Sequence, residues 1–299
     1  DNNHNDIIIK KKKLKKRKKK SRRRHGFHLN NILDKLPNFL RPRHRRENKK
    51  RKQYADIVIS FRGTDTQENV KIDLQIQRTR VKSKFWSCGD DGIGDDLEYL
   101  KTNTLWNKCI RPQNEINSLI IPELRIHTGF LRAFDDIRGR LLQTILTTYH
   151  RALFRQNKIP RFFITGHSLG GALAQLCGLL IGVLFGHKSP IYIYVYGCPR
   201  VGNFMFSNTL NRIVPHTYRL VYRGDTITTI PRGLMKYKHS GWEVIIDNNG
   251  NIIIDPNKTE ISLLPSRTSL KDHALINYIH GLNNVCTKNN MKHLLLHLP

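Results

Sequence analysis

The sequence predicts an α/β fold in which helices cover both faces of a mostly parallel central sheet. From Tyr54 onwards, short runs rich in Ile, Val, Tyr and Phe alternate with longer segments of helical periodicity. Each short run ends in a glycine or a polar turn, as buried strands usually do. Strands that alternate with crossover helices form parallel sheets, because each helix returns the chain to the edge where the next strand begins.

Four apolar runs are expected to be strands of this sheet: residues 56–61, 161–166, 191–197 and 217–224. Residues 130–154 carry large apolar side chains at three- and four-residue steps, which predicts a helix with one buried face. Residues 172–185 are apolar on nearly every face, which predicts a buried helix too short to span a bilayer. Residues 242–256 are expected to form a β-hairpin that turns at Asn248-Asn249-Gly250.

The net charge of +29 is concentrated near the start of the chain. Residues 1–53 hold 22 of the 52 lysines and arginines and four of the 23 acidic residues, a net charge of +18. Like charges at this density repel one another, and the segment has little apolar surface to bury. We therefore expect residues 1–53 to be a disordered basic extension and residues 54–299 to form the folded domain.

The basic run from residue 10 to residue 24 contains no aromatic side chain. Lys and Arg near an anionic membrane contribute about 1 kcal/mol each, so this run is expected to contact such a membrane peripherally. The same run could bind the phosphates of nucleic acid, non-specifically because no ring is present to stack on bases. A nuclear-import signal is a further interpretation of the same residues.

The cysteine pattern favours a reducing compartment. The five cysteines are odd in number and lack the spacing of a metal site, and Cys177 and Cys198 fall inside apolar runs. No signal peptide or transmembrane segment is visible, so the protein is expected to be intracellular and either soluble or peripheral to a membrane. The first residue is Asp1 rather than Met, which leaves open what precedes it. No metal or cofactor is expected, and the oligomeric state is not indicated.

The stretch FITGHSLGGALAQL, residues 163–176, places one serine between glycines where a strand is expected to end. Gly166-His167-Ser168-Leu169-Gly170 matches the G-x-S-x-G pattern of a nucleophile elbow, a strained strand–turn–helix that exposes a serine hydroxyl. The pattern alone also fits a tight turn in which small residues let two elements pack closely. Its place between a predicted strand and a predicted buried helix favours the elbow.

A serine hydroxyl needs a base to take its proton and an acid to orient that base. In the chain order of this class of hydrolase, both partners lie downstream at strand ends. Asp225 follows the fourth predicted strand, although a Gly-Asp pair also marks an ordinary turn. His273 opens an apolar segment that Ser269 or Asp272 could cap as a helix. His280 is the alternative base, two turns further along the same predicted helical face.

Six stretches occur in the order in which one known family carries them, and together they cover about residues 54–285. They are DIVISFRGTD (56–65), HTGFLRAF (127–134), ITGHSLGGALAQL (164–176), YGCPRVGN (196–203), RGDTITTIP (223–231) and DHALINYI (272–279). By these stretches the chain resembles the class 3, fungal-type (Rhizomucor-like) lipases, a family of the α/β-hydrolase fold.

The resemblance implies a serine-dependent carboxylic-ester hydrolase that cleaves acylglycerol or phospholipid esters through an acyl-enzyme. It assigns Ser168 as the nucleophile, Asp225 as the orienting acid and His273 as the base. It also implies an oxyanion hole made by the backbone N–H of Leu169 and by Thr64, because the charge that develops on the carbonyl oxygen needs two preorganised donors.

Three features depart from the family. Mostly basic residues stand before residue 61, in place of several helices and strands, so one edge of the sheet is expected to be uncovered or differently protected. Residues 66–87, where a lid would follow the oxyanion segment, are basic and only modestly amphipathic, which does not favour interfacial activation. Tyr278 follows His273 after a longer gap than in fungal members.

The sequence alone also allows a second class of function. The protein could bind nucleic acid or be targeted to the nucleus, with a hydrolase domain that is a passenger or has degenerated. The intact Ser, Asp and His set argues against degeneration. Ester hydrolysis that disappears in a Ser168→Ala variant would discriminate the hydrolase from both alternatives.

Overall fold

The computed structural model describes residues 53–63, 78–80, 110–119, 123–231, 236–263 and 269–288. The predicted basic extension lies outside these ranges up to residue 52, so its disorder and its boundary with the folded domain stay predictions. The segment expected in place of a lid, residues 66–87, lies outside them as well, except for residues 78–80.

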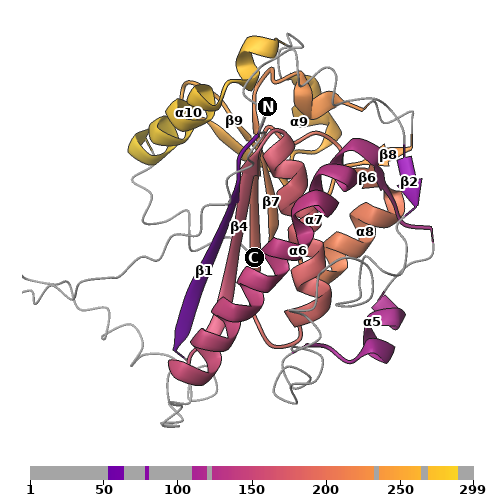
Figure 1. The fold of residues 1–299 in the computed structure, drawn as a ribbon. Coiled ribbons are helices and arrows are strands. Elements are labelled where there is room, and N and C mark those ends of the chain that lie inside the picture. Colours follow the sequence, from indigo (N-terminus) through magenta and orange to yellow (C-terminus); the bar gives the residue numbers. More distant parts are fainter. Residues whose placement is uncertain are drawn as a thin grey trace, which may run out of the picture. The chain divides into compact units, whose positions relative to one another are not determined.

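A six-stranded sheet forms the centre of the domain (Figure 1). Its strands lie in the order β1 (Tyr54–Phe61), β4 (Ile159–His167), β5 (Ile191–Tyr196), β7 (Thr217–Tyr222), β9 (Trp242–Ile246) and β10 (Ile252–Ile254). The first five pair in parallel, and β10 pairs antiparallel with β9. The mostly parallel sheet and the hairpin at its edge are therefore confirmed. In the described ranges, the outer edge of β1 pairs with no further strand.

Three helices cover one face of this sheet (Figure 1). They are α6 (Thr128–His150), α7 (Leu169–Phe185) and α8 (Phe204–Ile213). Every residue of α7 from Gly170 to Phe185 is buried, because the helix lies against β1, β4 and β5 on one side and against α6 and α8 on the other. The helix expected at residues 130–154 is α6, which continues into a π-helical turn at Arg151–Arg155.

Helix α10 (Leu275–Lys288) covers part of the opposite face, over β7 and β9. The alternation along β5 shows the two faces, since Ile193 and Val195 pack in the large core with α7. Tyr194 and Tyr196 instead pack against a second apolar cluster, formed mainly by β7, β9 and α10. The turn of the edge hairpin also holds α10, because the Asn284 side chain donates to the carbonyl of Asn248 over 2.7 Å.

A small antiparallel sheet lies apart from the main one. It is built from β2 (Arg78–Arg80), β3 (Arg125–His127), β6 (Gly202–Asn203) and β8 (Tyr237–Lys238). The remaining elements of the described ranges are two short helices, α5 (Gln113–Leu119) and α9 (Lys258–Leu263), and two 3-10 turns, Ile227–Thr229 and Leu270–His273. Among the described helices, none has the length and apolarity that a bilayer crossing requires.

Candidate active site

The strand β4 ends in a sharp turn that carries Ser168. Ser168 has φ 56° and ψ −124°, and α7 begins at the next residue. A positive φ is unfavourable for a residue with a side chain, so the surrounding structure must hold it. The Ser168 amide donates to the carbonyl of Tyr196 over 3.0 Å, which ties the turn to the neighbouring strand β5. The strand–turn–helix expected from the sequence is therefore present.

The two glycines of the pattern are required by close backbone contacts. A Cβ atom on Gly166 would lie 2.2 Å from the carbonyl oxygen of Gly170. A Cβ atom on Gly170 would lie 2.4 Å from the carbonyl oxygen of Phe61, at the end of β1. Larger residues would thus separate the first turn of α7 from the strands beneath it and displace the serine.

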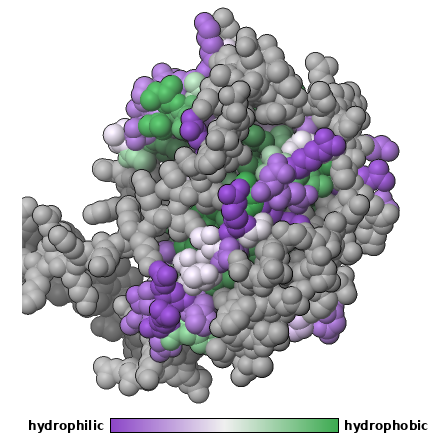
Figure 2. All heavy atoms as spheres, in the orientation of Figure 1, coloured by the Kyte–Doolittle hydropathy of each residue, from purple (hydrophilic) through white to green (hydrophobic). Residues whose placement is uncertain are grey.

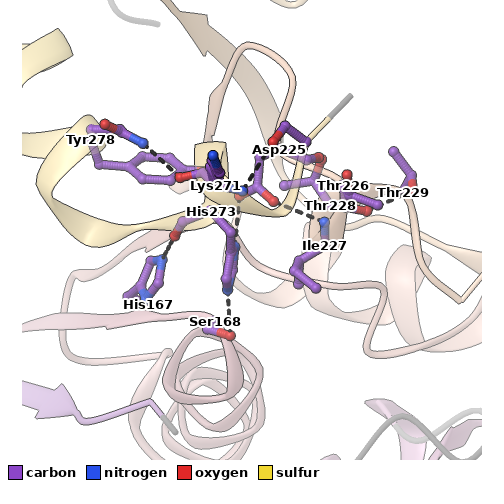
Figure 3. A network of polar contacts seen from close by, with 12 residues as sticks. His167, Ser168, Asp225, Thr226, Ile227, Thr228, Thr229, Lys271, His273 and Tyr278 are labelled. Atoms are coloured by element: carbon purple, nitrogen blue, oxygen red, sulfur yellow. Dashed lines mark hydrogen bonds and ion pairs between the residues drawn. The ribbon is translucent and has the colours of Figure 1, made fainter. Parts of the chain in front are cut away.

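The structure brings Ser168, His273 and Asp225 into one hydrogen-bonded row (Figure 3). His273 Nε2 lies 2.8 Å from Ser168 Oγ, and His273 Nδ1 lies 2.8 Å from Asp225 Oδ2. All three residues are buried; only 2% of Ser168 is exposed, so the expectation of an exposed hydroxyl is wrong for this structure. Ser168 can therefore transfer its proton to His273 without a rearrangement, and Asp225 already orients the histidine ring.

The carboxylate of Asp225 is held by three donors. Its Oδ1 accepts from the backbone N–H of Ile227 over 2.8 Å, and its Oδ2 accepts from His273 and from the hydroxyl of Tyr278 over 2.6 Å. Asp225 comes three residues after the end of β7, where its amide donates to the carbonyl of Tyr222 over 3.0 Å. Three donors hold the carboxylate in one orientation.

Tyr278 is the site residue that the sequence did not identify. It is fully buried on the inner face of α10, and its burial, followed by the negative charge of Asp225, raises its pKa well above the usual value. Its hydroxyl therefore stays a donor at neutral and moderately alkaline pH. Tyr278 stood out in the sequence only for its spacing from His273, and only the packing of α10 turns that spacing into a contact.

His280 does not share a helical face with His273. Ala274 has an extended conformation, with φ −60° and ψ 131°, and it separates the 3-10 turn that ends at His273 from α10. His280 is exposed on α10, whereas His273 is buried against Asp225. Ser269, one of the two predicted helix caps, accepts from the amide of Lys271 over 3.1 Å, but it caps the 3-10 turn and not α10.

Of the two predicted donors of the oxyanion hole, only Leu169 lies in the described ranges. The N–H of Leu169 is the first of α7, and the first N–H groups of a helix have no intrahelical acceptor, so it is available to a ligand. Thr64 lies outside the described residues. Gly63, just before it, lies against the elbow, since a Cβ atom there would be 3.4 Å from Ser168 Cβ. The role of both donors stays a prediction.

Two basic side chains hold the loop that follows Asp225. Arg200 Nη1 donates to the carbonyls of Thr229 and, over 2.8 Å, of Pro231. His239 Nε2 donates to the carbonyl of Thr228 over 2.7 Å. These bonds fix the shape of the loop without touching the reacting atoms. Within the described ranges, no group of three or more His, Cys, Asp or Glu side chains could hold a metal ion.

Comparison with known proteins identifies the relatives of this chain. The family model described as Lipase (class 3) matches residues 58–235. Secreted mono- and diacylglycerol lipase 1 of Fusarium solani is 31% identical over 122 residues, which are 41% of this chain and 34% of that protein. Phospholipase A1-Igamma2, a chloroplastic protein of Arabidopsis thaliana, is 27% identical over 235 residues, 67% of this chain and 39% of that protein.

Among solved structures, the triacylglyceride lipase of Rhizomucor miehei has the same fold. The TM-score is 0.51 and the sequence identity 24%, over 73% of this chain and 69% of that one. The α/β-hydrolase fold is therefore confirmed. The chain spans less than half of the length of the two curated relatives above.

Proposed function

The chain belongs to the class 3 lipase family, and from this we propose that it is a serine carboxylic-ester hydrolase that cleaves acylglycerol or phospholipid esters. The observation that carries the proposal is the hydrogen-bonded row of Ser168, His273 and Asp225 at the end of β4. In a family whose relatives include named acylglycerol lipases and a phospholipase A1, this row supplies the nucleophile, base and acid of acyl transfer.

The proposed reaction has two steps. Ser168 Oγ attacks the ester carbonyl while His273 Nε2 takes its proton, and the charge of Asp225 stabilises the resulting imidazolium. The N–H of Leu169, together with Thr64, stabilises the negative charge on the carbonyl oxygen. His273 then protonates the leaving alcohol, which leaves an acyl-Ser168 enzyme. Water, activated by the same histidine, releases the fatty acid and restores the serine.

Exposed apolar side chains beside the site support a lipid substrate. Leu275, Ile276 and Ile279 on the first turns of α10 are 47%, 52% and 45% exposed, and they begin two residues after His273. Figure 2 shows this apolar surface over α10. Contiguous exposed apolar surface is typical of sites that contact a membrane or another molecule. We propose that this surface faces the lipid that carries the ester.

Ser168→Ala tests the proposal directly. The variant is expected to lose at least about 10⁴-fold in kcat on triacylglycerol, monoacylglycerol and phospholipid, because triad members act as a unit. A serine-directed phosphonate should label Ser168 in the wild type and no residue in the variant. Ser189→Ala is the matched control. Ser189 is also buried, but it lies just before the start of β5, whereas the elbow contacts Tyr196 at the opposite end of that strand. Turnover that survives in Ser168→Ala would contradict the assignment.

We also propose that the basic run at residues 10–24 holds the enzyme on anionic membranes. Its charge supports this, and nothing in the described residues or in the relatives above supports the nucleic-acid alternative. Deletion of residues 1–53 should leave activity on a soluble short-chain ester unchanged. Activity on anionic vesicles should fall, together with its sensitivity to salt, because the lost attraction is electrostatic. Equal activity of both forms on anionic vesicles at low salt would exclude the tether.

We further propose that the protein acts inside the cell. This proposal rests on the described cysteines Cys177, Cys198 and Cys286, which are free thiols. The Fusarium solani relative is named as secreted, so the compartment has to be measured on this protein. Fractionation that finds the native protein only in the culture medium would contradict an intracellular place.

A further inference from the structure

Two successive residues of the elbow contact the same histidine at its two ends. Ser168 Oγ lies 2.8 Å from Nε2 of the His273 ring, and His167 Nε2 lies 2.8 Å from the carbonyl oxygen of His273 (Figure 3). The rings of His167 and His273 are also neighbours, with centroids 4.6 Å apart. The end of β4 therefore holds both the ring and the main chain of the proposed base.

The chemistry of the second contact is fixed. A carbonyl oxygen only accepts hydrogen bonds, so His167 Nε2 must carry the proton. Burial, followed by the nearby His273, lowers the pKa of His167 to about 4. His167 is thus a neutral donor at the pH where a serine hydrolase works, and it adds no positive charge beside the imidazolium that forms on His273.

The main chain of His273 needs such an anchor. His273 ends a 3-10 turn of four residues, and the extended Ala274 separates this turn from α10. The turn is tied at its start, where the amide of Ser269 donates to the carbonyl of Gly224 over 2.7 Å. At its other end, the hydrogen bond from His167 ties it to the elbow. The base is therefore held between the loop of the acid and the strand of the nucleophile.

We infer that His167 is a positioning residue that fixes the main chain of His273 and so keeps its ring nitrogen within reach of Ser168. The inference rests on the proposed function, whose base it concerns. An imidazole ring follows its own Cα atom, so a shift of the His273 carbonyl moves Nε2 away from the serine. A misplacement of about 1 Å at a reacting group can cost about 100-fold in rate.

Three substitutions separate the hydrogen bond from the bulk of the side chain. His167→Gln keeps an N–H donor at a similar reach, His167→Leu removes the donor, and His167→Asn keeps a polar side chain that is too short. On a soluble short-chain ester, we expect the Leu and Asn variants to lose about 10- to 100-fold in kcat. KM should stay near the wild-type value, because the contact orients the base and not the substrate. The Gln variant should retain most of the wild-type kcat.

The rate of inactivation by a serine-directed phosphonate gives a second measure of the same effect, since it depends on the activated Ser168. It should fall in parallel with kcat in the Leu and Asn variants. His216→Leu is the matched control, because that ring stacks on Tyr192 with centroids 5.0 Å apart, away from the elbow. Its kcat and phosphonate reactivity should equal those of the wild type.

Wild-type kcat in the Leu and Asn variants would overturn the inference. So would a Gln variant as slow as the Leu variant when both melt like the wild type, because the donor would then be irrelevant. Failure of the proposed function gives a different result, in which Ser168→Ala keeps its turnover or the wild type is not labelled by the phosphonate.

Discussion

Replacing Tyr278 by Phe tests whether the acid of the site needs its third donor. The Tyr278 hydroxyl donates to Asp225 Oδ2 over 2.6 Å, and the whole residue is buried. Phe keeps the ring, with its contacts to His167, Tyr196 and Tyr222, and removes one oxygen. Any effect therefore reports on the hydrogen bonds of the hydroxyl, which are the one to Asp225 and a weaker one with the backbone of Tyr222.

The expected loss follows from the partners that remain. A hydrogen bond to a charged group contributes about 1.5–3 kcal/mol to the free energy of unfolding. Asp225 keeps the N–H of Ile227 on Oδ1 and His273 on Oδ2, so we expect the lower part of that range, about 2 kcal/mol. For a domain of this size, the melting temperature should fall by roughly 4–8 °C. A carboxylate with one donor fewer orients His273 less well, and kcat should fall about tenfold.

Thermal melting and kcat on a soluble ester measure the two effects separately. Tyr196→Phe is the control, because its ring meets Tyr278 edge-on with centroids 6.2 Å apart, while no hydrogen bond links its hydroxyl to Asp225 among the described contacts. We expect the control to keep its kcat. A Tyr278→Phe variant with wild-type melting temperature and wild-type kcat would refute the reasoning.

Three further predictions use the same assays. His273→Ala should be as inactive as Ser168→Ala, whereas His280→Ala should keep nearly the wild-type kcat. The reverse result would assign the role of the base to His280. Gly197→Ala should lose most activity, because Gly197 has φ 56° and its Cβ atom would lie 2.8 Å from Asp225 Oδ2; a fully active variant would contradict this. His167 has its pKa lowered to about 4, so the unfolded chain binds more protons between about pH 6.5 and pH 4, and stability should fall as the pH falls through that window. Urea midpoints across this range should therefore depend less on pH in His167→Gln, and an unchanged slope would show that folding does not lower the pKa of His167.

The sequence predicted the parts of the fold that depend on local patterns. The main-sheet strands β1, β4, β5, β7 and β9 are runs rich in β-branched and aromatic residues, and the elbow is a glycine pattern between a strand and a helix. The smaller sheet was missed because its strands are only two or three residues long. No alternation can be recognised over so few positions.

The contacts between distant segments could not be predicted in the same way. Tyr278 lies 53 positions from Asp225, and only the docking of α10 brings the hydroxyl to the carboxylate. The error on His280 has a local cause, since one extended residue, Ala274, interrupts what the apolar pattern suggested was a continuous helix. His167 was predicted only as a member of the elbow, because its contact with the main chain of His273 exists only in the folded chain.

In the proposed enzyme, the edge hairpin links the acid of the site to structural changes far from the ester. Its turn binds the middle of α10 through Asn248 and Asn284, and α10 in turn carries Tyr278. Small units at the edge of a domain open more readily than its core. If the hairpin and α10 detach together, Asp225 loses a donor while β4 and α7 stay folded. Heated samples should then lose activity at a temperature below the one at which the central sheet melts, and cooling should restore it.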